Sequence, residues 1–140
     1  MSVSPPAKWL VRVASWFLGL VFICAGALKM ADPLAFADSV ASFQLLPGMM
    51  INAVALVLPV LEMLLGLSLL IGVRRRACAV AMGFLCVVFA VALTQALVRG
   101  LTVDCGCFGR GEASTSGNVR TLARALGLAP LAGWVSRRSR

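Results

Sequence analysis

The sequence predicts an all-α integral membrane protein: a four-helix bundle with a short amphipathic helix on the membrane surface in its first outward loop. Composition supports this class, because 61% of the 140 residues are hydrophobic and only 13% are charged. A typical soluble domain is about half apolar and about a quarter charged. Apolar segments long enough to span a bilayer also alternate with polar loops along the chain. No internal repeat is visible, so we expect one membrane domain over residues 1–140.

The predicted spans are residues 9–30, 50–72, 77–98 and 118–135. At about 1.5 Å per residue, each of the first three covers the ~30 Å hydrocarbon core. The fourth is shorter and contains Arg124 and Pro130. A secretory signal peptide is the alternative for the first segment, but its apolar stretch is long enough to span. Close helix packing is expected at four glycines: Gly19, Gly26, Gly66 and Gly83.

The loop after the first span predicts a short amphipathic helix. Asp32 can cap its start, and Pro33 suits its first turn. Phe36, Val40 and Phe43 then recur at helical spacing among polar residues, which favours a helix lying on the membrane surface. We interpret it as a packing lid over the bundle. A cover for the second outward loop, or a contact for a partner protein, is the alternative.

The basic residues predict the orientation of the spans. They gather before the first span, between the second and third, and after the fourth: Lys8, Arg12, Arg74, Arg75, Arg76, Arg137, Arg138 and Arg140. Placing these positions in the cytoplasm satisfies the positive-inside rule, with both termini inside. The net charge of +8 is then a topology signal, and we expect no nucleic acid partner. The other two loops face outward, into the compartment where disulfides persist.

Two cysteines, Cys105 and Cys107, lie one residue apart in the second outward loop. The glycine between them lets the backbone fold tightly enough to bring the two sulfurs together. A disulfide in so tight a turn is expected to be strained, and strained, exposed disulfides are the labile or catalytic ones. Arg99 and Arg110 would favour a thiolate, whereas Asp104 opposes it. A redox-active dithiol is the favoured interpretation, with a structural disulfide as the alternative.

A soft-metal site at the same two cysteines is a further alternative, but no methionine or histidine lies beside them as a third ligand. The chain has no histidine at all, which counts against haem, a histidine-containing zinc site and a Cys-His nucleophilic pair. We therefore predict no metal site.

Glu62 lies near the middle of the second predicted span. A carboxylate at that depth is costly, so we expect it to be protonated, paired or facing a cavity. We predict Arg124 as its partner, because this is the basic residue of the fourth span that lies within the core. Lys29, at the outer end of the first span, is expected to extend to the surface instead. A structural ion pair and a role in proton or quinone handling are both open.

Several short segments together resemble one family: Ala25-Gly26-Ala27-Leu28-Lys29, Leu45-Leu46-Pro47, Pro59-Val60-Leu61-Glu62, Gly66, Arg99-Gly100 and Cys105-Gly106-Cys107-Phe108-Gly109. With them the chain resembles the MauE/DoxX family of small redox-associated membrane proteins, and most closely its MauE group of methylamine utilisation proteins. The resemblance runs from about Phe17 to Gly109, and the Cys-Gly-Cys-Phe-Gly element is its most specific part.

The resemblance implies a four-helix bundle in the bacterial inner membrane. It also implies a role in disulfide formation or maturation of a periplasmic partner, in the MauE group the disulfide-rich small subunit of methylamine dehydrogenase. We therefore expect Cys105 and Cys107 to exchange disulfides with a periplasmic thiol protein or disulfide-rich client, with quinone as a candidate electron acceptor. Lys29, Glu62, Arg99 and Phe108 are the expected supporting residues.

Whether this chemistry makes the protein a thiol–disulfide oxidoreductase stays open. One alternative function is a non-enzymatic membrane assembly factor, or chaperone, whose disulfide only rigidifies the loop. The other is a small transporter built around Glu62 and Arg124.

Overall fold

A computed structural model describes residues 5–101, 103 and 115–138, and every element among them is a helix. The helices are α1 (Pro5–Ala31), α2 (Pro33–Ser42), α3 (Gly48–Ile71), α4 (Arg75–Val98) and α5 (Thr115–Arg138). The all-α prediction is therefore confirmed for this part of the chain. Cys105, Cys107 and Phe108 lie outside the described residues.

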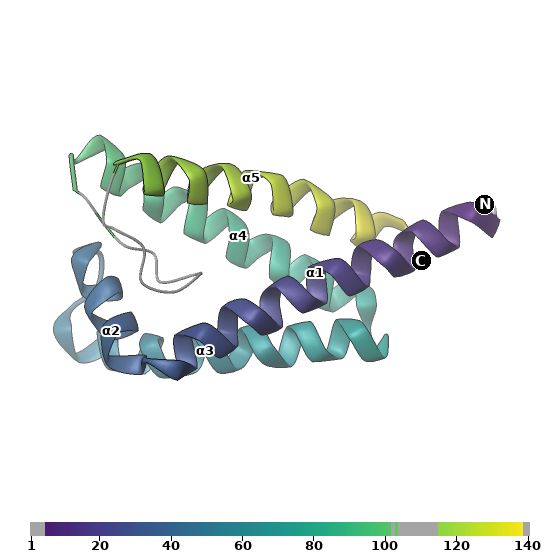
Figure 1. The fold of residues 1–140 in the computed structure, drawn as a ribbon, viewed down its shortest axis with the longest axis horizontal. Helices are drawn as coiled ribbons and strands as arrows, with labels where there is room; N and C mark the ends of the chain where they lie inside the picture. The colour runs from purple at the N-terminus through teal and green to yellow at the C-terminus, as the bar shows by residue number, and fades with distance from the viewer. Residues whose placement is uncertain (1–4, 102, 104–114, 139–140) are drawn as a thin grey trace.

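The helices pack mainly as two pairs, α1 with α3 and α4 with α5 (Figure 1). The short α2 lies at one end of the molecule, where it packs against α3. The opposite end holds the start of α1, the end of α5 and the turn between α3 and α4. Each long helix therefore runs from one end of the molecule to the other, as membrane spans do.

Three helical segments are long and apolar enough to cross a membrane: Lys8–Ala31 of α1, Gly48–Ile71 and Arg75–Val98. In the most apolar stretch of each segment, only 33%, 28% and 33%, respectively, is buried inside the protein. Among the exposed side chains are Phe17, Leu61 and Phe84, which need an apolar surrounding. These features indicate a multi-pass membrane protein. The fourth predicted span lies within α5, and its crossing of the membrane stays a prediction.

Glycines allow α1 and α3 to cross closely. A Cβ built on Gly19 would lie 2.9 Å from the carbonyl oxygen of Gly66, and one on Gly66 would lie 2.7 Å from that of Gly19. A Cβ on Gly26 would lie 2.8 Å from the carbonyl oxygen of Pro59. Close packing is thus confirmed at these three glycines. Gly83 also faces α5, but a Cβ there would meet its nearest neighbour, the Cβ of Ala132, at an ordinary 3.6 Å, so this position does not require glycine.

The helix α2 begins as its sequence predicts. The Asp32 side chain accepts a hydrogen bond from the backbone N–H of Ala35 at 3.1 Å, and Pro33 occupies the first turn. Phe36 and Phe43 are buried, whereas Leu34 is 78% exposed. The helix is therefore fixed to the protein through one aromatic face. Its position at the membrane surface stays a prediction.

Candidate functional site

The centre of the candidate site is a buried ion pair between Lys29 and Glu62. Lys29 lies in the last turn of α1 and is 2% exposed, and Glu62 lies in the middle of α3 and is 7% exposed. The Lys29 Nζ atom lies 2.7 Å from each of the two Glu62 carboxylate oxygens. The ammonium thus donates to both oxygens, and each charge compensates the other away from water.

This pairing corrects two sequence predictions. Arg124 was the predicted partner of Glu62, and Lys29 was expected to extend to the surface. The close crossing of α1 and α3 near Gly26 and Pro59 is the reason, because it brings the end of α1 alongside the middle of α3. From there the long lysine side chain reaches inward to the carboxylate.

Two aromatic rings flank the Lys29 ammonium. Its Nζ lies 5.2 Å from the ring centroid of Phe36, on α2, and 5.5 Å from that of Phe89, on α4. Both distances are within cation–π range. Lys29 is therefore the point at which α1, α2, α3 and α4 meet. Phe36 thus brings one face of α2 against the ammonium, and the role of α2 as a packing lid stays a prediction.

A cavity of about 130 Å³ adjoins the ion pair. Its walls are mostly apolar, but Lys29, Glu62, Cys86, Thr121 and Arg124 also line it. A space of this size has room for several water molecules. Arg124 thus reaches the wall of this cavity, although the atoms that contact the Glu62 carboxylate belong to Lys29.

Packed side chains connect the ion pair to the start of the cysteine segment. The ring of Phe89 meets that of Phe43 edge to face, with centroids 6.2 Å apart. Phe43 belongs to a buried cluster with Leu93 and Val103, and Val103 is 2% exposed. Val103 precedes Cys105 by two positions in the sequence. The chain is therefore anchored against α2 and α4 immediately before the two cysteines.

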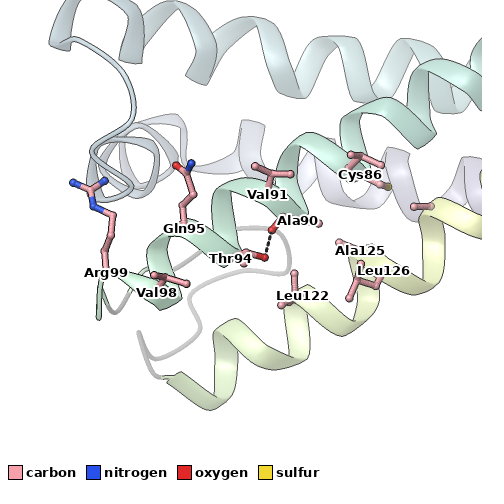
Figure 2. Close-up of a pocket in the computed structure, with 12 residues that line it drawn as sticks. Cys86, Ala90, Val91, Thr94, Gln95, Val98, Arg99, Leu122, Ala125 and Leu126 are labelled. Atoms are coloured by element: carbon pink, nitrogen blue, oxygen red, sulfur yellow. Dashed lines mark hydrogen bonds between the residues drawn. The ribbon is translucent and has the colours of Figure 1, made fainter.

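Arg99, another predicted supporting residue, is the C-cap of α4 and lies near that anchor. Its side chain is exposed and lies at one end of an open groove of about 670 Å³ between α4 and α5 (Figure 2). Thr94 and Gln95 also line this end, and the Thr94 hydroxyl donates to the Ala90 carbonyl at 2.7 Å. The remaining lining is apolar, which suits a lipid-soluble chain.

Sequence reasoning missed Phe36, Phe89 and Cys86 as parts of this site. Phe36 was recognised only as a member of an apolar helical face. Cys86 is 7% exposed and lines the cavity beside the ion pair. No local sequence signal distinguishes either aromatic residue from ordinary core, since their role follows from their distance to Lys29.

The fold and this interior define a small helical, multi-pass membrane protein built around one buried ion pair. The chain belongs to the MauE family: the model of that family, described as methylamine utilisation protein MauE, matches residues 7–137. No solved structure matches the chain.

Three relatives, each named methylamine utilization protein MauE, are similar to this chain. The relative from Paracoccus denitrificans is 37% identical over 110 residues, which cover 78% of this chain and 58% of the relative. That from Methylophilus methylotrophus is 32% identical over 124 residues, covering 88% and 65%. That from Paracoccus versutus is 36% identical over 134 residues, covering 91% and 70%. The chain thus matches 58% to 65% of the length of the first two relatives.

Proposed function

We propose that this protein is a MauE-like membrane factor that supports disulfide formation in a periplasmic partner, or its maturation, through Cys105 and Cys107. Membership of the MauE family and the names of the relatives support a role in methylamine utilisation. The candidate client is the disulfide-rich small subunit of methylamine dehydrogenase, as the family resemblance implies. The Cys-Gly-Cys element supports thiol–disulfide exchange as the chemistry.

The observation that carries the proposal is the buried position of Val103 beside Phe43. Val103 is buried two residues before Cys105, so it gives the cysteine segment a fixed base from which thiols can reach a partner. The packing from Val103 through Phe43 and Phe89 to Lys29 ties this base to the buried ion pair. In this proposal, Lys29 and Glu62 are positioning residues: the ion pair holds α2 and α4 together, and these two helices hold Val103 in place.

Charge distribution supports an orientation with the cysteine loop outward. The described acidic residues Asp32 and Asp38 lie on and beside α2, near that base. The opposite end holds only basic residues among the described charges: Lys8, Arg12, Arg74, Arg75, Arg76, Arg137 and Arg138. In a bacterial inner membrane, the proposed orientation has both termini in the cytoplasm and the cysteines in the oxidising periplasm.

The proposed exchange balances without a metal. A partner thiolate attacks one sulfur of the Cys105–Cys107 disulfide, forming a mixed disulfide and releasing the other cysteine as a thiolate. The second partner thiolate then attacks the mixed disulfide, so the partner leaves oxidised and the pair is left as a dithiol. Reoxidation needs a two-electron acceptor, and a membrane quinone would supply that sink. The apolar α4–α5 groove, with Thr94, Gln95 and Arg99 at one end, suits such a molecule.

The test uses a background in which Cys24, Cys78 and Cys86 are replaced by serine or alanine. In it, Cys105→Ser and Cys107→Ser should each abolish oxidation of the client, and one of them should trap a client-linked mixed disulfide. The matched control is the background protein with both outer cysteines. If both single variants still support client oxidation, the proposal fails and the assembly-factor function takes its place. A transporter would instead lose its transport activity in Glu62→Gln and keep it in both cysteine variants.

A further inference from the structure

Three consecutive arginines lie where the turn between α3 and α4 leads into the first turn of α4. Among residues 5–101, 103 and 115–138, no carboxylate pairs with Arg74, Arg75 or Arg76. Glu62 is the nearest acidic residue along α3, and it precedes Gly72 by about ten residues, or about 15 Å of helix. Three positive charges therefore lie together at this end of the molecule with no counter-charge from the described protein.

Arg75 is held in place rather than free in solvent. Gly72 ends α3 with φ +89°, and a Cβ built on it would lie 2.7 Å from an Arg75 guanidinium nitrogen. The guanidinium thus packs directly onto the turn, and its buried Nε has no hydrogen-bond partner. A guanidinium fixed in this way loses little freedom when it binds, and its planar donors match the oxygens of a phosphate.

An open apolar groove continues from the arginines along α4. It has a volume of about 770 Å³ and is lined by the three arginines together with Ala77, Val80, Ala81 and Phe84. Val80 and Phe84 are 56% and 67% exposed. They are four positions apart and therefore share one face of the helix. The small side chains of Ala77 and Ala81 leave the space that forms the groove.

We infer that this surface is a binding site for an anionic phospholipid, with the phosphate on the arginines of the turn and one acyl chain in the groove along Val80 and Phe84. Charge complementarity favours an anionic head group. The helices α3 and α4 are long and apolar enough to cross a membrane, so the three unpaired arginines at their joined ends would lie at the depth of the lipid head groups. The adjoining apolar groove selects a lipid over a free phosphate, since a soluble anion gains nothing from it. The inference does not depend on the proposed redox function.

The experiment measures lipid binding to the purified full chain in a neutral detergent. The probes are phosphatidylglycerol and phosphatidylcholine with identical acyl chains. Wild type should prefer phosphatidylglycerol, and Arg75→Gln/Arg76→Gln should weaken its binding about 30-fold. The matched control, Arg137→Gln/Arg138→Gln, removes the same charge at the same end of the molecule and should change the affinity less than threefold. Equal losses in the two double variants, or no preference between the lipids, would overturn the inference.

Two further arms separate the lipid from other anions and from misfolding. Ala81→Trp fills the groove and should weaken phosphatidylglycerol binding, whereas Leu64→Trp, at an exposed position of α3 that lines neither this groove nor the α4–α5 groove, should not. Inorganic phosphate should compete poorly, and competition as strong as that of the lipid would mean a free-phosphate site instead. If the Arg75 variant does not fold, Arg76→Gln against Arg138→Gln repeats the comparison with side chains that are both exposed.

Discussion

The Lys29 ammonium lies 2.7 Å from both carboxylate oxygens of Glu62, and this ion pair fastens the end of α1 to the middle of α3. Both residues are buried, at 2% and 7% exposure, although a small cavity adjoins them. The rings of Phe36 and Phe89 complete the enclosure. Side chains from four helices therefore meet around this buried ion pair.

Breaking that pair from one side should be costly. Lys29→Met leaves the Glu62 carboxylate buried without a partner, so we expect a loss of about 3–5 kcal/mol in the free energy of unfolding. The double variant Lys29→Met/Glu62→Leu removes both charges and should recover most of that loss. Denaturant unfolding in detergent measures both. Lys8→Met, an exposed lysine of the same helix, is the control, and an equal effect there would show that the ion pair does not form.

The crossing of α1 and α3 should tolerate no added methyl group. Gly66→Ala would place a Cβ 2.7 Å from the Gly19 carbonyl oxygen, so we expect a loss of about 1–3 kcal/mol from overpacking. Gly83→Ala is the matched control, because its Cβ finds ordinary contacts at 3.6 Å and alanine favours a helix. Thermal unfolding of the two variants should therefore shift in opposite directions. A tolerated Gly66→Ala would mean that the two helices are farther apart than described.

The contact between Phe36 and Lys29 should hold α2 in place. Phe36→Ala removes a buried ring and its cation–π contact, and we expect it to cost about 3–5 kcal/mol. Leu34→Ala on the same helix is the control, because Leu34 is 78% exposed. Limited proteolysis between residues 32 and 47 gives the local readout. Cleavage should accelerate in the Phe36 variant alone, and equal rates in both variants would contradict the role of α2 as a lid.

Single-cysteine reporters should test the proposed orientation. In a background without native cysteines, Asp38→Cys on α2 should react with a membrane-impermeant maleimide in intact cells. Arg76→Cys, exposed at the opposite end, should react only after the membrane is opened. The positive-inside rule gives this expectation, since the basic residues gather at the Arg76 end. The reverse pattern would place the cysteine loop in the cytoplasm and remove the oxidising environment that the proposed function needs.

Local patterns in the sequence predicted much of the fold. The apolar segments predicted the three helices that are able to cross a membrane, and Asp32-Pro33 predicted the start of α2. The small residues Gly19, Gly26 and Gly66 predicted a close helix crossing. These features depend on the nearest neighbours along the chain, so composition and spacing are enough to find them. The Cys-Gly-Cys element was found in the same way, and its residues lie outside the part of the chain that the structure describes.

The partner of Glu62 could not be predicted in this way. Arg124 was chosen because its position in the fourth span puts it within the membrane core, but depth in the membrane does not determine which helices are neighbours. Likewise, nothing in the sequence around Phe89 distinguishes it from core residues of α4. Its role follows from a ring centroid 5.5 Å from Lys29 Nζ.

The sequence by itself thus determined the helical class, the segments that suit a membrane and the presence of a costly charge at Glu62. Hydropathy and helical period act locally, and they need no knowledge of the fold. Tertiary structure alone decided that Lys29 compensates that charge and that α2 covers the pair. The physical reason is the close glycine crossing of α1 and α3, which directs a long, flexible side chain inward to the carboxylate rather than outward to the surface.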